Sequence, residues 1–162
     1  MKNFRYSYDK ITRYALIIMV WAMCMGTAWA GPEFSKGQTL YVPAYSHIYI
    51  GHKASPYLLT ITLSIRNIDS ESSLLLTAVD YYGTEGKLIR QYLTAPVTIP
   101  PMASTRYVVP APDKTGGSGA NFIVKWTAMK KINAPIVESI MIGTRSQQGI
   151  SFTSRGQEIA RP

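Results

Sequence analysis

Residues 57–67 read YLLTITLSIRN, a segment in which aliphatic and polar side chains alternate. Every second position carries an aliphatic residue, namely Leu59, Ile61, Leu63 and Ile65. Because successive side chains of a β-strand point to opposite faces, this period of two predicts a strand with one buried face and one face toward water. The many β-branched residues favour the same interpretation.

The same alternation recurs along the chain between turn-forming residues. A loop bounded by glycines at 83–86 predicts a hairpin, and NIDS at 67–70 predicts a turn. We expect strands at 39–46, 57–67, 73–82, 87–93, 106–109, 122–127, 136–142 and 150–152. Since no segment after residue 30 keeps a helical period, the sequence predicts an all-β fold, an immunoglobulin-like antiparallel β-sandwich of about seven or eight short strands.

The first thirty residues have the organisation of a secretory signal peptide. Basic residues come first, an apolar run occupies 14–25, and Ala28-Trp29-Ala30 supplies the pattern of small residues that signal peptidase reads. The apolar run is shorter than the about 20 residues that span a bilayer core. We expect a signal-peptide helix over 1–30, cleavage directed by Ala28 and Ala30, and a single β-sandwich domain over 31–162. An uncleaved membrane anchor is the alternative.

Cleavage would leave the mature protein exported, in the periplasm or outside the cell, with only transient contact to the membrane through the leader. It would also remove Cys24, the only cysteine of the chain, and with it any disulfide or thiolate site. Residues 31–162 hold 13 basic and 8 acidic side chains, scattered along the sequence. Nucleic-acid binding needs a basic stripe or a recognisable module, so we expect no nucleic-acid partner.

Several segments resemble the signature segments of a bacterial family catalogued as domain of unknown function 3124. They are YVPAYSHIY at 41–49, SIRN at 64–67, DYY at 80–82 with the following Gly86-Lys87, GGSGANF at 116–122 and GISFTS at 149–154. The similarity extends over about residues 37–159, and the glycine-rich segment is its most specific part. The resemblance implies an exported single-domain protein of unassigned role, and it carries over no catalytic residues.

The tyrosine-rich segment is one candidate binding site. On a continuous strand over 41–49, one face would carry Tyr41, Tyr45, His47 and Tyr49. Tyrosine presents a flat apolar ring with a polar tip, so such a strip could stack on sugar rings or hold an apolar partner. The alternative is that this face packs inside the sandwich, with only the hydroxyl groups at the surface.

The glycine-rich segment is a second candidate site, formed by Gly116, Gly117, Ser118, Gly119 and Asn121. Backbone N–H groups in such a loop can bind anions. A phosphate-binding loop, however, contains a Lys-Ser/Thr pair and leads into a helix, whereas 121–127 predicts a strand. We therefore favour a tight connection between strands or a β-bulge.

The histidines and one aspartate are candidates for metal binding or hydrolysis. A bend at Gly51 could bring His47 and His52 together. Soft ligands would come from Met102, Met129 and Met141. No close His-x-Met spacing supports such a site, so we assign no metal ligand. Asp80 ends a predicted strand, where it would cap the following turn or act as an acid.

These observations predict a small, non-enzymatic exported protein that acts as a binding or structural module of the bacterial envelope. The expected partner is an envelope protein or a glycan, and we expect no cofactor. The alternative is an exported metal-handling protein or a small hydrolase that uses His47, His52 or Asp80.

Export with cleavage predicts the N-terminus of the mature protein. Sequencing of the protein recovered from the exported fraction should read Gly31-Pro32-Glu33, because signal peptidase cuts after the small residue Ala30. The Ala30→Tyr variant should keep its leader. A wild-type protein that still begins at Met1 would show that the segment is retained as an anchor.

Overall fold

The computed structural model describes residues 14, 34–51, 54–145 and 148–161. The chain divides into two compact units, residues 1–31 and 32–162. Apart from Tyr14, the predicted signal-peptide helix lies outside the described residues, and so do Ala28 and Ala30. In the part that is described, no helix is long and apolar enough to cross a membrane.

The described part of residues 32–162 contains twelve β-strands. They are β1 (Phe34–Pro43), β2 (His47–Ile50), β3 (Ser55–Leu58), β4 (Thr60–Arg66), β5 (Leu74–Tyr82), β6 (Leu88–Gln91), β7 (Val97–Ile99), β8 (Ser104–Val109), β9 (Asn121–Asn133), β10 (Ile136–Arg145), β11 (Gln148–Arg155) and β12 (Gln157–Ala160).

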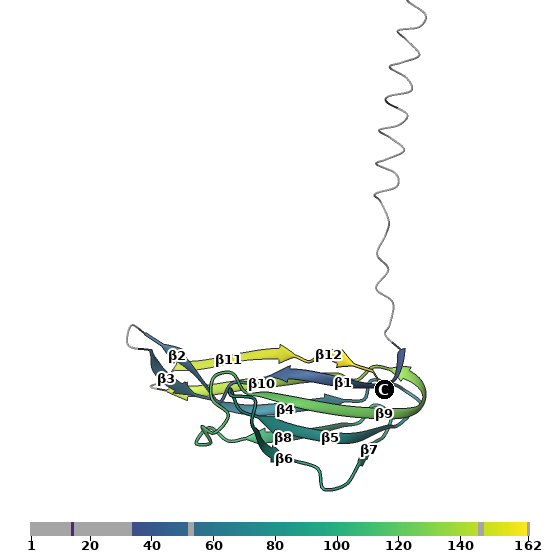
Figure 1. The fold of residues 1–162 in the computed structure, drawn as a ribbon. Helices are drawn as coiled ribbons and strands as arrows, with labels where there is room; N and C mark the ends of the chain where they lie inside the picture. Colours follow the sequence, from purple (N-terminus) through teal and green to yellow (C-terminus); the bar gives the residue numbers. More distant parts are fainter. Residues whose placement is uncertain (1–13, 15–33, 52–53, 146–147, 162) are drawn as a thin grey trace, which may run out of the picture. The chain divides into compact units, whose positions relative to one another are not determined.

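The strands form two larger antiparallel sheets and one hairpin. The six-stranded sheet has the order β12-β1-β9-β5-β6, with β7 also paired to β5, and the four-stranded sheet has the order β11-β10-β4-β8. Figure 1 shows the two sheets as layers, with the β2–β3 hairpin at one end of them. The predicted antiparallel β-sandwich is confirmed, with more strands in the described part than the seven or eight that we expected.

Several strand boundaries differ from the sequence prediction. The segment 57–67 is divided between β3 and β4 at Leu59, whose backbone N–H donates to the carbonyl of Ser46 at 3.0 Å. β9 and β11 are longer than expected, and β7 and β12 were not expected at all. β7 and β12 are short strands without a clear apolar alternation, so their pairing with β5 and β1 depends on contacts far apart in the sequence.

The aliphatic residues of β4 supply one half of the core. Ile61, Leu63 and Ile65 are fully buried, as are Phe122 and Val124 of β9 in the other sheet. All of them belong to a single hydrophobic cluster. Burial of each such side chain stabilises the fold by about 1.5–3 kcal/mol. This shared core determines which face of each sheet is turned outward.

A β-bulge changes the inward face of β5 partway along the strand. Leu74 and Leu76 are buried at even positions, whereas Val79 and Tyr81 are buried at odd positions. The register with β9 shifts between Leu76 and Ala78, which inserts one extra residue into β5. As a result, the side chain of the even-numbered Asp80 faces away from the core.

The chain crosses between the sheets at several points. It passes from β8 to β9 through the glycine-rich segment, from β9 to β10 at 134–135, and from β11 to β12 at Gly156. The backbone N–H of Gly156 donates to the carbonyl of Val137 at 2.8 Å. A Cβ atom at Gly156 would lie 3.1 Å from that same oxygen, so the close crossing favours glycine.

The turn predicted at 67–70 is held by a buried carboxylate. Asp69 accepts three backbone N–H groups, from Ser72 (2.8 Å), Glu71 (3.1 Å) and Asn133 (3.1 Å). The bonds from Asn133 and then Glu71 hold the pKa of Asp69 below its usual value, against the opposing effect of burial. This carboxylate therefore joins the β4–β5 loop to the end of β9.

Asp69 should make stability depend on pH. Its pKa is lower in the folded than in the unfolded chain, so its contribution is present above about pH 4 and is lost as the pH falls through the lowered pKa. Urea unfolding should give a lower midpoint for Asp69→Asn than for wild type at neutral pH, and the two curves should converge in acid. Glu85→Gln, at an exposed loop position, is the control and should follow the wild type. If the urea midpoints of Asp69→Asn and wild type differed by the same amount at every pH, the pH dependence would not come from Asp69.

Candidate functional site

The structure brings together the two candidate segments from the sequence. At one end of the sandwich, the backbone N–H of Ala44 donates to the carbonyl of Ala120 at 2.8 Å. Both the backbone N–H and the hydroxyl of Ser46 donate to the carbonyl of Gly117 at 3.0 Å. The segment after β1 is therefore bound along the glycine-rich loop, and these bonds bend the chain out of the six-stranded sheet.

The hairpin loop between β5 and β6 binds the other side of the glycine-rich loop. The backbone N–H and hydroxyl of Thr84 donate to the carbonyl of Gly116 at 2.9 and 3.0 Å, and the N–H of Gly119 donates to the Thr84 hydroxyl at 2.9 Å. The carbonyl of Gly116 and the N–H of Gly119 therefore form hydrogen bonds within the protein. The arrangement favours the tight inter-strand connection that we expected here over an anion-binding loop.

Two glycines of the loop are required by its geometry. Gly117 has φ +77°, in the left-handed region that disfavours other residues. A Cβ atom at Gly116 would overlap the hydroxyl of Tyr81 and lie 2.6 Å from its Cζ. Tyr81 is fully buried, and its hydroxyl group has no hydrogen-bond partner among the residues that the structure describes. Burial, followed by the nearby charge of Asp113, raises the pKa of Tyr81 well above its usual value.

Both ring nitrogens of His47 have hydrogen-bond partners. Nδ1 lies 3.3 Å from the Ser46 hydroxyl oxygen, and Nε2 lies 3.3 Å from the Tyr49 hydroxyl. Since Ser46 gives its proton to Gly117, the neutral ring donates from Nδ1 to Ser46 and accepts at Nε2 from Tyr49. Ser46 is itself buried and is not placed as a nucleophile.

The expectation of a single strand with four aligned side chains over 41–49 is wrong. β1 ends before Tyr45 and β2 begins after it, so Tyr41 and Tyr49 lie in different sheets. The ring of Tyr45 packs edge-on against Phe152, with centroids 5.7 Å apart. The hydrogen bonds to the glycine-rich loop cause the break. A binding role for these residues stays a prediction.

Tyr41 instead belongs to a row of side chains across the outer face of the six-stranded sheet. Strand pairing aligns Gln157 (β12), Tyr41 (β1), Ile123 (β9), Asp80 (β5) and Gln91 (β6). In β1, β5 and β9, the residues on either side of the row are buried in the core, so the row itself points outward. Asn121 pairs with Tyr82 in the neighbouring row and lies on the same face.

A second polar cluster braces the beginning of the glycine-rich loop. Arg90 lies over the ring of Tyr92, 5.5 Å from its centroid, and pairs with Asp113 at 3.4 Å. The hydrogen bond from the Thr115 hydroxyl is the main cause that lowers the pKa of Asp113. The cluster stabilises the loop.

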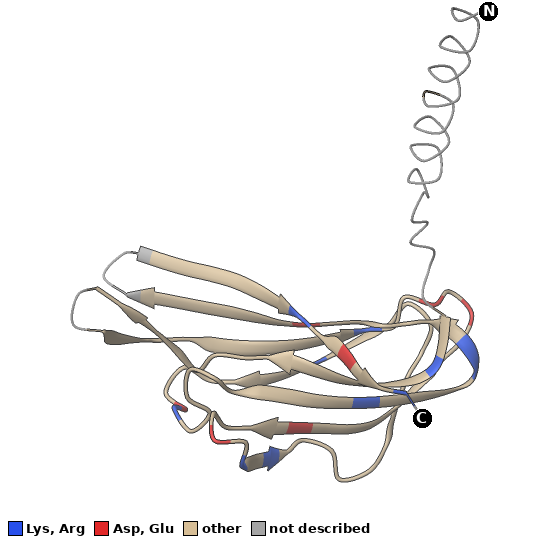
Figure 2. Cartoon of the chain, turned by 45° about the horizontal axis from the view of Figure 1, so that its top comes forward, with Lys and Arg blue, Asp and Glu red and all other residues tan. Residues whose placement is uncertain are grey.

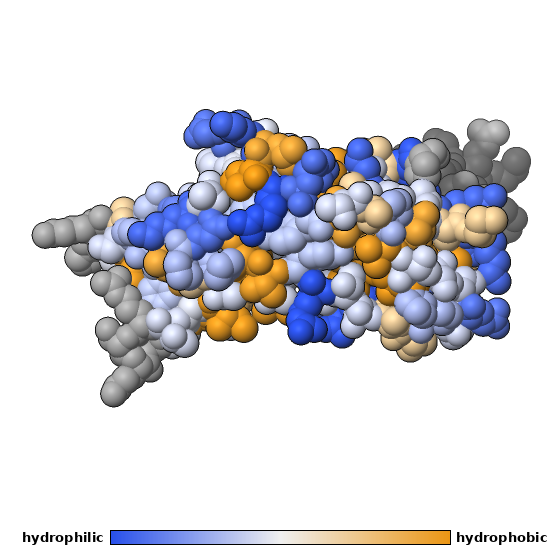
Figure 3. Space-filling model, turned by 90° about the horizontal axis from the view of Figure 1, so that it is seen from below, coloured by the Kyte–Doolittle hydropathy of each residue, from blue (hydrophilic) through white to orange (hydrophobic). Residues whose placement is uncertain are grey.

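Figure 3, a view from below on the side of β6 and β7, shows hydrophobic residues as small patches between hydrophilic ones.

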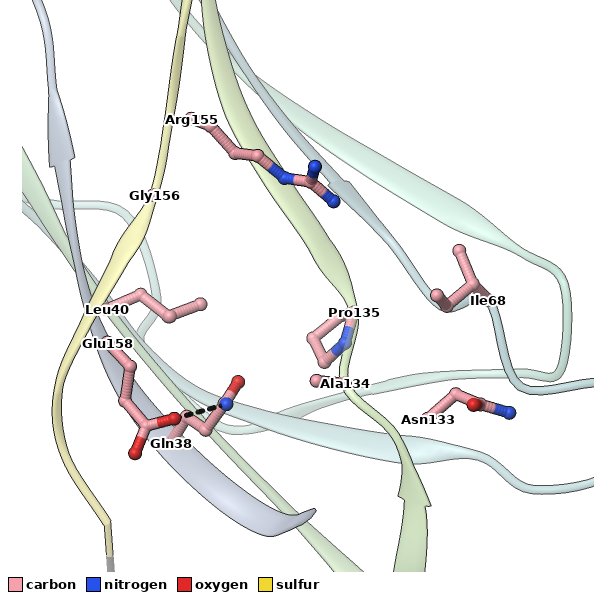
Figure 4. A pocket seen from close by; sticks show the side chains of 9 residues that line it. All are labelled: Gln38, Leu40, Ile68, Asn133, Ala134, Pro135, Arg155, Gly156 and Glu158. Carbon is pink, nitrogen blue, oxygen red and sulfur yellow. Dashed lines mark hydrogen bonds between the residues drawn. The ribbon is translucent and has the colours of Figure 1, made fainter. Parts of the chain in front are cut away.

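A pocket of about 280 Å³ opens beside the crossing at Gly156. Figure 4 shows Arg155 reaching across this pocket toward the side where Ile68 lies, with Pro135 next to Ala134 below them. The described lining residues include no histidine, so among them the pocket does not unite a histidine with a carboxylate or a methionine.

The floor of the pocket is a chain of hydrogen bonds. The indole N–H of Trp126 donates to the buried Gln38 at 3.3 Å, and the Gln38 amide donates to Glu158 at 2.6 Å. Glu158 also forms an ion pair with Arg161. The carboxylate is therefore paired on both sides, which fits a structural network better than a catalytic acid.

The described residues contain no group of three or more His, Cys, Asp or Glu side chains that could hold a metal. Met141 is buried in the core, whereas Met102 and Met129 are strongly exposed. His52 lies outside the described residues. The part of the chain that is described therefore offers no observation in favour of the metal-handling or hydrolase alternative.

Sequence reasoning missed the outer-face residues Tyr82, Gln91 and Gln157. Tyr82 could have been found from the alternation in β5, had the bulge been recognised. Gln157 and Gln91 lie in short edge strands whose partners are distant in sequence. Asn121 and Asp80 were singled out, but for a loop site and for turn capping and not for a place on a sheet face.

A family model described as "Protein of unknown function (DUF3124)" matches residues 37–159. The chain belongs to the DUF3124 family. The matched region reaches from β1 to β12, so the glycine-rich loop and the outer-face row both lie within the DUF3124 domain. No curated protein matches the chain.

One solved structure similar to this DUF3124 protein is described as "Crystal Structure of Thermotoga maritima 1070". The two chains are 12% identical, with a TM-score of 0.45, and the similarity covers 77% of this chain and 97% of the other.

The buried hydroxyl of Tyr81 predicts an unusual result for its removal. Tyr81→Phe should raise the free energy of unfolding by about 1–3 kcal/mol, because a buried polar group without a partner costs that much. Chemical denaturation measures the change. Tyr82→Phe, on the outer face, is the control and should stay near the wild type. Lower stability of Tyr81→Phe would show that the hydroxyl has a partner.

Gly116→Ala should destabilise the protein by about 1–3 kcal/mol, because the new methyl group overlaps the Tyr81 hydroxyl. The cost should be smaller when the same change is made in Tyr81→Phe. Gly149→Ala is a matched control, since nothing lies within 4 Å of a Cβ atom there. If Gly116→Ala lowered stability equally in the wild type and in Tyr81→Phe, the loss would not come from the Tyr81 hydroxyl.

Proposed function

We propose that this DUF3124 protein is a non-enzymatic binding module of the bacterial envelope that holds a glycan on the outer face of its six-stranded sheet. The observation that carries the proposal is the transverse row with Tyr41, Asp80 and Gln91, together with Tyr82 and Asn121 in the next row. The N-terminal signal pattern supports a location in the envelope.

The chemistry of this face suits a sugar chain. Tyr41 is 37% exposed and Tyr82 is partly buried, so each ring has support from the sheet and an accessible surface. Tyrosine rings offer a flat apolar surface with a polar tip. Between and beside them lie a carboxylate and two carboxamides, which can accept and donate hydrogen bonds to hydroxyl groups.

The geometry of the sheet fits an extended ligand. Tyr41 and Tyr82 belong to β1 and β5, which are separated only by β9. At about 4.8 Å per strand, their backbones lie about 10 Å apart across the sheet. A ligand that reaches both rings would pass over Ile123 and Asn121, which come from the intervening strand.

The charge of the face favours a neutral ligand over a polyanion. Asp80 provides one negative charge, and Lys125, two residues beyond Ile123 on β9, provides one positive charge. These side chains stand on the paired strands of one sheet, so binding does not have to order the backbone beneath them.

The test is binding to purified cell-wall glycan in a pull-down with measured affinity. Tyr41→Ala and Tyr82→Ala should each weaken binding about 2- to 12-fold, as expected for the loss of an aromatic contact of about 0.5–1.5 kcal/mol. Asp80→Asn should weaken it by a similar factor through its hydrogen bonds.

Tyr49→Ala is the matched control, because Tyr49 is 57% exposed but lies in the β2–β3 hairpin and not on the sheet face. It should bind like the wild type. Loss of binding with Tyr49→Ala and not with Tyr41→Ala would move the site to the hairpin. No binding by any form would remove the proposal.

A further inference from the structure

A large bulge interrupts the pairing of β9 with β1. Gly37 pairs with Thr127 and Ser35 pairs with Ile132, so only Lys36 of β1 faces four residues of β9. Ordinary bulges place two residues opposite one. Residues 128–131 are therefore pushed out of the regular ladder at the end of the domain where β1 begins.

Of the residues pushed out, Ala128 is partly buried, and the three exposed ones are one apolar residue followed by two basic ones. Met129 is 98% exposed, although methionine is normally a buried residue. Lys130 and Lys131 follow it and are also exposed. Nothing in the core requires an apolar side chain at position 129, so this side chain is free to contact a partner.

The surroundings of the bulge repeat the combination of apolar and basic side chains. Phe34, which is 51% exposed, lines a shallow depression of about 200 Å³ together with Lys36, Lys131 and Arg161. Figure 2 shows the positive charges on the bend of β9 and close to the C-terminus, whereas most of both sheets carries no charge.

Acidic residues near the bulge do not neutralise it. Glu71 approaches Lys130 at 3.9 Å, but both side chains are well exposed and such a pair is weak. Glu158 is paired with Arg161 and Gln38. Lys36 and Lys131 have no ion pair among the described residues, although Asp69 also lies at this end, where it accepts from the N–H of Asn133. Around the bulge, the described residues supply four basic side chains (Lys36, Lys130, Lys131 and Arg161) and three acidic ones (Asp69, Glu71 and Glu158), a surplus of one positive charge.

We infer that this end of the domain docks on an anionic lipid surface, with Met129 and Phe34 entering the headgroup region and Lys36, Lys130 and Lys131 facing the lipid phosphates. Apolar side chains beside lysines are typical of segments that lie in a membrane interface. A soluble polyanion would use the lysines but would leave Met129 and Phe34 without a role.

The patch follows the predicted leader closely in the sequence. Phe34 follows the predicted cleavage site after only three residues. The basic and apolar side chains are thus gathered at the end of the domain that is closest in sequence to the membrane-directed segment. The inference uses none of the residues of the proposed glycan face, so either can fail alone.

Sedimentation with lipid vesicles tests the inference, using the exported protein with the N-terminus that it has in the cell. It should bind vesicles of phosphatidylglycerol mixed with phosphatidylcholine more tightly than vesicles of phosphatidylcholine alone, and added salt should weaken the difference. Each lysine near such a surface contributes about 1 kcal/mol, so Lys130→Gln with Lys131→Gln should lower the partition coefficient about 30-fold.

Two further variants separate the apolar and the general electrostatic contributions. Met129→Ser should also weaken binding to the anionic vesicles, because it removes the inserted side chain. Lys87→Gln with Lys114→Gln removes two exposed lysines at the other end of the sandwich and should leave binding unchanged. Thermal unfolding should be the same for all variants.

Three outcomes would overturn the inference. Equal binding to both kinds of vesicle would show that lipid charge is not recognised. An equal loss of vesicle binding in the Lys130/Lys131 and the Lys87/Lys114 double variants would show that only the net charge of the protein matters. If Met129→Ser bound the anionic vesicles as well as the wild type, Met129 would not enter the headgroup region, and only the electrostatic attraction of the lysines would be left.

Discussion

The burial of the aliphatic face of β4 against the other sheet is the constraint on which the rest of the molecule depends. Once Ile61, Leu63 and Ile65 share a core with Phe122 and Val124, the direction of every second side chain in both sheets is determined. The outward positions are then left for function, and tyrosine, amide and acidic side chains occupy them on the six-stranded sheet. The same constraint forces the chain to cross between the layers, and the crossings need glycines 116, 117 and 156.

The sequence pattern was sufficient for the fold class, because a period of two is visible in each strand that contributes heavily to the core. It was not sufficient for the bulges. The extra residue near Ala78 and the expanded bulge opposite Lys36 change the facing of Asp80 and Met129, and only pairing with distant strands reveals them. The break after β1 has the same cause, since Ala44 and Ser46 are held by a loop more than seventy residues away. The sequence therefore named candidate residues, whereas their arrangement came only from the fold.

The candidate surfaces divide the molecule into regions with different chemistry. The outer sheet face is flat, nearly neutral and aromatic. The end with the β9 bulge is basic with exposed apolar tips. The opposite end, with the glycine-rich loop, satisfies most of its polar groups internally, which suits a role in holding three segments together. A protein with these surfaces could bridge a glycan and a membrane within the envelope, as the two separate proposals together suggest.

The last strand limits how much of the edge of β1 is open to other chains. β12 is only four residues long, yet it covers an edge of β1, which is a ten-residue strand. An uncovered strand of that length offers a row of free N–H and C=O groups to any other chain. β12 pairs only with Thr39, Leu40 and Tyr41, so loss of its residues by proteolysis would free the N–H and C=O groups of that part of β1 for pairing with another chain.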